Sequence, residues 1–398
     1  MAEWIECKIS DIGTVVGGAT PSTKKPENYE NGTIAWITPK DLSTFTGRYI
    51  QRGERNITEI GLKNCSTQLL PKDTVLFSSR APIGYVAIAA NEVCTNQGFK
   101  SVIPNENTDP LFLYYLLKYN KDKMEGMGSG TTFKEVSGNT MKNIVVSVPT
   151  DKKVQERISS MLGSIDDKIE ENERINKNLE QQAEALFKAW FLDYIPWNGN
   201  VPSSWIDGKL GDFTDIKRGG SPRPIQKYLS NSGLRWLKIS DVTSLQTPFV
   251  IDIKDHIIED GLKKTVLLKE GSLVLSNSAT PGIPKILDVD SCIHDGWLYF
   301  PQSKFSREYL YLYFKYIRQQ LVNLSNGSVF NNLKTDILKN YPTILPDKET
   351  LQRFDSIVNP IFLEIQNRTR ESHQLVDIRD ALLPKLMSGE LDVSDINL

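Results

Sequence analysis

The stretch "WIECKISDI" at residues 4–12 decides the fold, because the chain repeats it as "WIDGKLGDF" at residues 205–213. Three residues of the first copy recur 201 positions later, namely Trp4 as Trp205, Lys8 as Lys209 and Asp11 as Asp212. Repetition at a long interval marks a structural unit that occurs more than once in a chain. The chain therefore begins the same fold twice.

The repeat extends well beyond its opening. "VVGGATPS" at residues 15–22 matches "IKRGGSPR" at 216–223, and "GSGTTF" at 128–133 matches "SNGSVF" at 325–330. The separation falls from 201 to 197 between these two pairs, which is what small deletions in loops produce. We therefore expect two related copies that differ mainly in their loops.

Each copy has the pattern of a sheet-rich α+β domain. Short runs such as "DTVLFSS" and "GSLVLSN" are rich in Val, Leu and Phe and lie between turn-forming residues, which predicts strands. "PLFLYYLLKYNKDKM" and "SREYLYLYFKYIRQQLVNL" have the length and spacing of helices. We expect two tandem domains, domain 1 at residues 1–150 and domain 2 at residues 196–345.

A period of seven follows each domain, in residues 151–195 and 346–390. Apolar residues recur there in steps of four and three, as in the seam of a coiled coil. Arg368, Ser372 and Arg379 interrupt the second seam. The predicted seam residues are Ile158, Leu162, Ile165, Ile169, Leu179, Leu186, Val358, Ile361, Ile365, Leu375, Leu382 and Leu386.

The order of the segments predicts how the two helices pair. The first helix leads into domain 2 and the second leaves it, so they would form an antiparallel coiled coil with pseudo-two-fold symmetry. Asn172 and Asn176 would meet Arg368 and Ser372 at mid-helix and fix the register. The C-terminal tail, residues 391–398, would return toward the N-terminus.

Charge is divided along the chain, although the net charge is only −2. Residues 1–150 carry 16 Lys and Arg against 15 Asp and Glu, and residues 196–345 carry 18 against 14. Residues 151–195 carry 7 against 10, and residues 346–398 carry 6 against 10. Two mildly basic domains are compatible with DNA contact in a few loops, but their charge falls short of a basic footprint that would establish it.

The cysteines and the apolar runs indicate the cellular compartment. No apolar run approaches the roughly 18 residues that span a bilayer, and "MAEWIE" at the start lacks the features of a signal peptide. The four cysteines are scattered without a CxxC pair. We expect a cytoplasmic protein with reduced thiols and no membrane contact.

In the order of its motifs, the whole chain resembles the specificity (S) subunit of type I restriction–modification systems. The resemblance is carried by the duplicated opening, "GGATPS" and "GGSPRP", "WITPKDL" and "WLKISDV", "SSRAPIGYVAI", and the helix tails "LFKAWFLDY" and "LLPKLMSGELDV". It implies a non-catalytic subunit that reads two half-sites of double-stranded DNA across a fixed gap. It also implies docking of two methyltransferase (M) subunits and of motor-nuclease (R) subunits. No cofactor is expected in this chain, because SAM, ATP and Mg²⁺ would belong to those partners.

Candidate DNA contacts are polar and basic residues of the predicted loops. Lys and Arg bind phosphates, while Arg, Lys, Asn, Gln, Ser and Thr read base edges in the major groove. In domain 1 the candidates are Thr20, Ser22, Lys24, Lys25, Lys40, Ser79, Arg80, Tyr85, Asn96, Gln97, Lys100, Thr131, Thr132 and Lys134. In domain 2 they are Arg218, Ser221, Arg223, Lys227, Lys238, Asn277, Ser278, Lys285, His294, Asn331 and Lys334. A solvated turn residue is the competing interpretation for each of them.

Two other function classes were weighed against DNA recognition. A fused methyltransferase would need a (D/N)PP(Y/F) base pocket and a Gly-rich SAM turn, and the sequence contains neither. His256, His294 and His373 stand far apart without zinc spacing, so no metal site is expected. A protein-interaction adaptor, with duplicated peptide-binding domains on a coiled-coil rod, remains the alternative.

Overall fold

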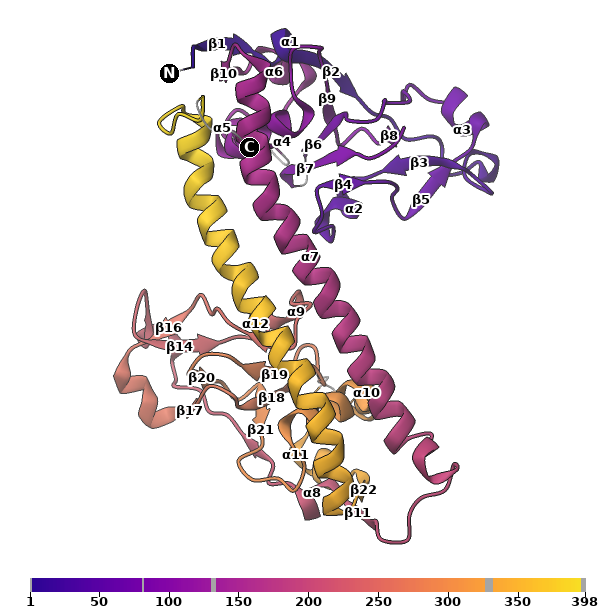
Figure 1. Cartoon of the computed structure of the whole chain (residues 1–398), viewed down its shortest axis with the longest axis vertical. Helices are drawn as coiled ribbons and strands as arrows, with labels where there is room; N and C mark the ends of the chain where they lie inside the picture. The colour runs from indigo at the N-terminus through magenta and orange to yellow at the C-terminus, as the bar shows by residue number, and fades with distance from the viewer. Residues whose placement is uncertain (1, 81, 130–133, 326–331, 395–398) are drawn as a thin grey trace. The chain divides into compact units, whose positions relative to one another are not determined.

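The chain folds into two compact units, each containing one of the two copies. Unit 1 comprises Met1–Glu170 and Gln374–Leu398, and unit 2 comprises Glu171–His373. The long helices α7 (Lys152–Phe191) and α12 (Lys348–Met387) each contribute one segment to each unit (Figure 1). The structure, a computed structural model, describes residues 2–80, 82–129, 134–325 and 332–394.

Unit 1 contains a five-stranded sheet, a three-stranded sheet and a two-stranded ladder. The five-stranded sheet has the order β2-β9-β6-β7-β4, the three-stranded sheet has the order β5-β3-β8, and β1 pairs with β10. The strands are β1 Trp4–Lys8, β2 Gly13–Gly17, β3 Ile34–Ile37, β4 Tyr49–Ile50, β5 Arg55–Ile57, β6 Val75–Ser79, β7 Ile83–Ala89, β8 Cys94–Thr95, β9 Lys100–Pro104 and β10 Val145–Pro149.

Short helices connect and cover these strands. They are α1 Ile9–Ile12, η1 Pro26–Asn28, α2 Pro39–Ser43, α3 Glu59–Lys63, α4 Pro110–Tyr119, α5 Lys121–Gly126 and α6 Gly138–Asn143. Asp109 caps α4 by accepting the N–H of Phe112, and Pro110 stands at the first helical position. Helix α4 packs on β6 and β7 (Figure 1). Its Phe112 and Tyr115 are fully buried in the main core of unit 1.

Unit 2 repeats this arrangement with two five-stranded sheets and one ladder. The sheet orders are β12-β21-β18-β19-β15 and β13-β16-β14-β20-β17, and β11 pairs with β22. The strands are β11 Ile206–Lys209, β12 Lys217–Arg218, β13 Leu229–Ser230, β14 Leu234–Leu237, β15 Phe249–Val250, β16 His256–Ile257, β17 Val266–Leu268, β18 Leu273–Ser276, β19 Pro284–Leu287, β20 Ser291–Ile293, β21 Trp297–Tyr299 and β22 Pro342–Leu345. The helices are η2 Ile195–Trp197, α8 Leu210–Phe213, η3 Ile225–Lys227, α9 Ser240–Thr243, η4 Glu259–Lys264, α10 Arg307–Ser325 and α11 Thr335–Lys339. Two sheet-rich α+β copies, each followed by a long helix, confirm the fold class expected from the sequence.

The repeated opening motif builds a strand followed by one helical turn. In unit 1, β1 pairs antiparallel with β10, and the Lys8 backbone N–H donates to Asp11 Oδ2 at 2.8 Å. The Lys8 ammonium donates to Asn143 Oδ1 at 3.0 Å. Lysine and aspartate therefore recur because they close the turn and join it to the end of α6, just before the last strand.

The second copy uses the same contacts. The Lys209 backbone N–H donates to Asp212 Oδ2 at 2.8 Å, and its ammonium donates to Asn340 Oδ1 at 2.9 Å. Strand β11 pairs with β22 as β1 pairs with β10. The sequence repeat is thus a repeat of specific hydrogen bonds.

Segments of α7 and α12 run antiparallel within unit 1. Arg379 Nη1 donates to Asp166 Oδ1 at 2.7 Å, and the Arg157 guanidinium donates to the Ser394 carbonyl. Ile158 of α7 lies in the same core cluster as Leu386 of α12. Residues later in α7 therefore contact residues earlier in α12, as they must in an antiparallel pair.

The polar layer expected at mid-helix is present in unit 2. Arg368 Nη1 donates to Asn172 Oδ1 at 3.1 Å, as the sequence predicted, and Asn172 Nδ2 donates to Glu371 Oε2 at 2.8 Å. Asn176 donates to Thr369 Oγ1 at 3.3 Å rather than to Ser372. The register of these helix segments is therefore held by specific polar pairs.

Each long helix also has a second apolar face that the heptad pattern did not predict. Phe187 and Phe191 of α7 are buried in the main core of unit 2 together with Phe354 and Phe362 of α12. The Phe191 and Phe354 rings stand edge to face with centroids 4.8 Å apart. The helix segments therefore belong to the core of the unit and are more than a rod beside it.

Candidate nucleic-acid interface

The loop after β2 lies against the loop between β8 and β9 in unit 1. Ala19 donates its backbone N–H to the Thr95 carbonyl at 3.0 Å, and a Cβ on Gly18 would lie 2.2 Å from the same oxygen. The Thr20 hydroxyl donates to the amide oxygen of Gln97. Both side chains are exposed, so the close approach allowed by glycine presents a hydroxyl and an amide together.

Two neighbouring candidates hold this loop in place. Asn96 Oδ1 accepts the N–H of Gly98 at 2.8 Å, which closes a tight turn. Ser79 is fully buried and donates its N–H and its hydroxyl to the Gly98 carbonyl at 2.7 and 3.2 Å. This placement favours a structural role for Ser79 and a turn-forming role for Asn96.

Carboxylates accompany the predicted cations of unit 1. Lys100 Nζ lies 3.2 Å from Glu135 Oε1, and Arg80 Nη1 lies 3.9 Å from Glu135 Oε2. Lys40 pairs with Glu54 at 2.7 Å on the surface. The other candidates are Ser22, Lys24, Lys25 and Lys134, which are exposed, Tyr85, which is half-buried, and Thr131 and Thr132, which lie outside the described residues.

The equivalent loops of unit 2 share this backbone frame but carry different side chains. Gly220 donates its N–H to the Ile293 carbonyl at 3.2 Å. The Ser221 hydroxyl donates to Asp295 Oδ1 at 2.7 Å, where unit 1 has a hydroxyl and an amide. A carboxylate therefore replaces the amide at the matching position.

Asp295 gathers two arginines around this position. Arg223 Nη2 donates to Asp295 Oδ2 at 3.1 Å, and Arg218 Nε donates to the Asp295 carbonyl. The hydrogen bond from Ser221 holds the pKa of Asp295 below its usual range, with Arg218 and Arg223 adding to this effect and partial burial opposing it. Asp295 is therefore ionised at neutral pH.

His294 forms the turn that Asn96 forms in unit 1. Its Nδ1 accepts the N–H of Gly296 at 2.8 Å. Burial lowers the pKa of His294, and this effect outweighs the nearby Asp295 carboxylate, which raises it. The imidazole is therefore neutral at pH 7 and carries its proton on Nε2.

We expect His294→Asn to reduce the acid sensitivity of unit 2. The folded-state pKa of His294 lies below the ordinary 6.5, so the unfolded chain binds more protons. The contribution of His294 to stability is therefore complete above about pH 6.5 and is lost as the pH falls from that value through the folded-state pKa. Asparagine would keep the contact to Gly296, as Asn96 does with Gly98.

The measurement is urea unfolding of the whole chain at about pH 7.5 and about pH 5.5. Hydrogen exchange of the β20 and β21 amides reports the unfolding of unit 2. The variant should lose less free energy of unfolding between the two pH values than the wild type. An equal loss in both proteins would contradict the role given to His294.

Two candidates of unit 2 are buried. The Lys285 ammonium donates to the carbonyls of Leu245 at 2.8 Å and Thr247 at 2.5 Å, and burial lowers the pKa of Lys285 to about 8. Asn277 donates its Nδ2 to the Asp295 carbonyl at 3.3 Å. Their placement favours structural roles, because neither polar group reaches the surface.

A hollow of about 790 Å³ lies beside the Asp295 cluster. Its walls combine the ring of Trp236 with the polar groups of Ser221, Arg223, Lys238 and His294. The Lys238 ammonium lies 2.5 Å from an Asp255 carboxylate oxygen. The other candidates are Arg218, Lys227 and Lys334, which are exposed, Ser278, which is half-buried, and Asn331, which lies outside the described residues.

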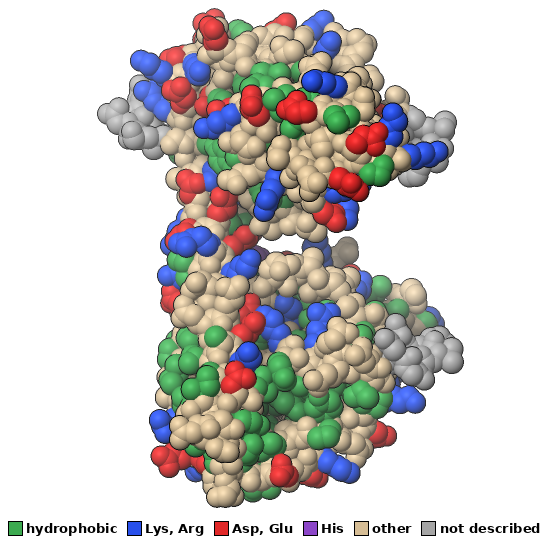
Figure 2. Space-filling model, turned by 90° about the vertical axis from the view of Figure 1, so that its right-hand side faces the viewer, with side chains coloured by type: hydrophobic (Ala, Val, Ile, Leu, Met, Phe, Trp, Pro, Cys, Tyr) green, Lys and Arg blue, Asp and Glu red, His purple; other side chains and the backbone are tan. Residues whose placement is uncertain are grey.

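Acidic partners are the feature that the choice of candidates from sequence missed. Glu135 and Asp295 stand beside predicted cations, and Figure 2 shows Lys and Arg side chains interspersed with Asp and Glu on one face of the molecule. Alignment of "TNQGF" at 95–99 with "IHDGW" at 293–297 places Asp295 opposite Gln97. That alignment was the signal in the sequence that could have identified Asp295.

Metal and membrane sites were sought in the same way. Within residues 2–80, 82–129, 134–325 and 332–394, no three His, Cys, Asp or Glu side chains gather as they would around a metal ion. Among the helices described, none combines the length and the apolar character needed to cross a bilayer.

Comparison with known proteins identifies the family. The model of the type I restriction modification DNA specificity domain matches residues 1–181 and 202–372. The chain is 34% identical to the type I restriction enzyme MjaIX specificity subunit of Methanocaldococcus jannaschii, over 99% of this chain and 95% of that protein. It is 23% identical to the HindI specificity subunit of Haemophilus influenzae, over 98% and 100%. The crystal structure of a type I S subunit from M. genitalium has the same fold, with a TM-score of 0.63 at 16% identity over 99% and 97% of the two chains. The chain therefore belongs to the non-catalytic DNA specificity subunits of type I restriction–modification systems.

Proposed function

We propose that this specificity subunit reads a bipartite DNA target, with one half-site at each domain and a gap of fixed length between them. The observation that carries the proposal is the pair of matching loop clusters. Thr20 and Gln97 in domain 1 occupy the same frame as Ser221 and Asp295 in domain 2. One frame with two sets of polar groups is suited to reading two different short sequences.

The exposed polar groups fall into two kinds of DNA contact. Hydroxyl, amide and guanidinium groups in the loop clusters present the donors and acceptors that base edges in the major groove require. Exposed lysines such as Lys24, Lys25, Lys227 and Lys334 are suited to phosphates, which fix the position of a protein on the duplex without reading sequence. Specificity is thus proposed to depend on few residues and affinity on many.

The long helices are proposed to separate the domains and to dock the partner subunits, two M subunits together with R subunits. Helix α12 exposes Ile357 at 42% and Leu363 at 56%, and hydrophobic side chains gather on the lower part of Figure 2, which is unit 2. The segments 151–195 and 346–398 carry a net negative charge. SAM, ATP and Mg²⁺ would act in the partner subunits, in the cytoplasm, and this chain would hold no cofactor.

The test is a methylome. When this chain is expressed with its M subunits in a host that lacks the system, adenine methylation should occur at one bipartite motif. The M subunits alone should leave that motif unmethylated. Methylation without the chain, or at an undivided motif, would contradict the proposal.

The adaptor alternative predicts a different response to salt. If the complex of this chain and its M subunits binds DNA through six to ten phosphates, its affinity for a duplex should fall about 10³- to 10⁵-fold between 50 and 200 mM salt. A peptide-binding adaptor would show no such fall for DNA. The duplex and a scrambled duplex of equal length should be compared at each salt concentration.

A further inference from the structure

The two loop clusters differ most at two matched positions. Domain 1 has Ser22 and Gln97 where domain 2 has Arg223 and Asp295, as "VVGGATPS" at 15–22 aligned with "IKRGGSPR" at 216–223 and "TNQGF" aligned with "IHDGW" show. The first pair is neutral, whereas the second is an ion pair with Nη2 and Oδ2 3.1 Å apart. Domain 2 therefore has a charged group at a place where domain 1 has none.

Arg223 is exposed but held in position. Its side chain is 79% exposed, lines the hollow beside Trp236, and stands between Pro222 and Pro224, whose rings restrict the backbone. One of its five N–H groups donates to Asp295. The remaining donors include a parallel pair with the geometry that guanine O6 and N7 accept.

Asp295 holds this arrangement through both of its carboxylate oxygens. Its Oδ1 accepts from Ser221 at 2.7 Å and its Oδ2 accepts from Arg223 at 3.1 Å. Arg218 also donates to its backbone carbonyl. The carboxylate is therefore oriented by protein donors, which gives it the role of a positioning group.

The charges favour a base over a phosphate as the partner of Arg223. A carboxylate 3.1 Å from the guanidinium offsets part of its positive charge and so weakens its attraction for a phosphate. The O6 and N7 atoms of guanine carry no formal charge, so their hydrogen bonds to the guanidinium depend less on its net charge. A guanidinium paired with a carboxylate is thus better suited to a base edge than to the backbone.

We propose that Arg223 reads a guanine in the half-site of domain 2 and that Asp295 is its positioning residue, an inference that rests on the proposed function. Arginine contacting guanine through two hydrogen bonds discriminates strongly against other bases. Domain 1, with a serine at this position, would not read its half-site in this way.

The first test compares methylomes of the complete methyltransferase complex. Arg223→Ala should leave the gap and the other half-site unchanged, while the preference for guanine at one position falls at least about tenfold. Asp295→Asn should relax the same position to a smaller extent, because asparagine can still accept from Ser221. Two controls, Lys227→Ala at an exposed lysine of the same domain and Ser22→Ala at the matched position of domain 1, should leave that guanine required.

A second measurement keeps the inference decidable if Arg223→Ala abolishes methylation. Each guanine of the wild-type motif is replaced in turn by 7-deazaguanine, which lacks the N7 acceptor, and duplex binding is measured with both complexes. One guanine should weaken binding to the wild type and have no further effect on Arg223→Ala. A motif unchanged in Arg223→Ala, equal sensitivity of both complexes, or a changed half-site without guanine would overturn the inference. Failure of the proposed function would be distinct, since the wild type would then methylate no bipartite motif.

Discussion

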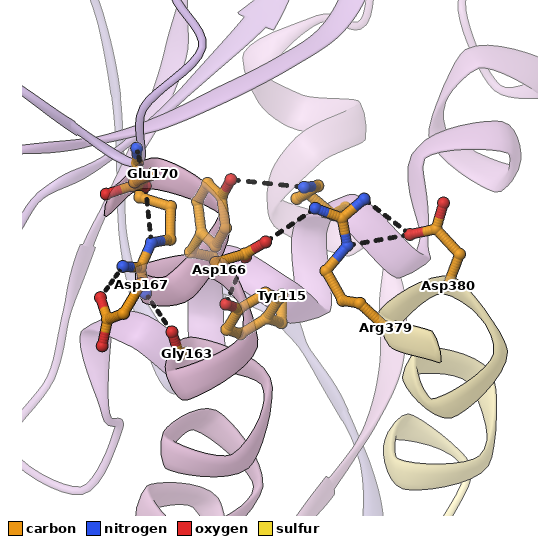
Figure 3. A network of polar contacts seen from close by, with 10 residues as sticks. Tyr115, Gly163, Asp166, Asp167, Glu170, Arg379 and Asp380 are labelled. Atoms are coloured by element: carbon orange, nitrogen blue, oxygen red, sulfur yellow. Dashed lines mark hydrogen bonds and ion pairs between the residues drawn. The ribbon is translucent and has the colours of Figure 1, made fainter. Parts of the chain in front are cut away.

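Arg379→Met should lower the free energy of unfolding of unit 1 by about 3–5 kcal/mol, the usual cost of removing one partner from a buried ion pair. Arg379 Nη1 lies 2.7 Å from Asp166 Oδ1, and their side chains are 17% and 7% exposed. Figure 3 shows Asp166 between Tyr115 and Arg379. Methionine would fill much of the space but would leave the buried carboxylate without its counter-ion.

Tyr115 cannot replace the lost charge. Its hydroxyl donates to Asp166 Oδ2 at 2.6 Å. Burial, and after it the Asp166 carboxylate, raises the pKa of Tyr115 far above its usual range, so the hydroxyl stays a neutral donor. One neutral hydrogen bond contributes much less than an ion pair to stabilising a buried carboxylate.

The measurement is urea unfolding of the whole chain, in which hydrogen exchange of the α4 amides reports the unfolding of unit 1. Lys40→Met is the matched control, because Lys40 pairs with Glu54 on the surface, where side chains are 78% and 66% exposed, and it should leave stability almost unchanged. Adding Asp166→Asn to Arg379→Met should restore part of the loss by removing the unpaired charge. Equal effects of the Arg379 and Lys40 variants would show that the ion pair between Arg379 and Asp166 contributes no more to stability than an exposed pair.

Arg379 illustrates what the sequence reveals about the long helices. It was visible as an interruption of an apolar seam, and so was Arg368, which meets Asn172. The heptad pattern predicted the helices and the polar positions in their seam, and the order of the segments predicted the antiparallel pairing. It did not predict that Phe187 and Phe354 would enter the core of unit 2, because contact between a helix and a distant sheet leaves no signal in the local period.

For the loop clusters, the sequence predicted where the loops lie but missed one of the residues that organise them. Turn residues and glycines predicted where the loops lie, and Thr20, Gln97, Ser221 and Arg223 are grouped there by hydrogen bonds. Choosing basic, amide, hydroxyl and imidazole side chains passed over Asp295, since a carboxylate is a poor partner for DNA until its own arginines are known. Residue type indicates which groups can touch a base, whereas pairing within the protein decides which of them are free to do so.

The burial of Lys285 also left no signal in the sequence. Lys285 was predicted to contact DNA, but β19, which carries it, is buried along its whole length. The ammonium donates to two backbone carbonyls instead of facing solvent. Strand alternation gives no warning when both faces of a strand are covered.

Removing one heptad from both α7 and α12 should change the gap of the DNA target and leave both half-sites as they are. The seven residues are removed from within 163–178 of α7 and within 366–381 of α12, between the segments that pack into the two cores. Seven residues turn a helix to within about 20° of two full turns, so the facing surfaces of the helices stay in phase. The helices become shorter by about 10.5 Å, and in the proposed arrangement this brings the reading domains closer by about three base pairs at about 3.4 Å each.

Duplex geometry sets the size of the effect. Three base pairs turn the DNA by about 100° at about 10.5 base pairs a turn, so one half-site also rotates relative to the other around the duplex axis. Methylation of the original motif should therefore be lost. At the new optimal gap, the variant should methylate more slowly than the wild-type complex methylates its own motif. A plasmid library that varies the gap over one helical turn, read by methylome sequencing, measures both quantities.

Shortening α7 alone is the control and should abolish methylation at every gap, because the polar pairs between the helices would no longer meet. An unchanged gap would exclude the helices as the spacer, and a changed half-site would exclude the two domains as independent readers.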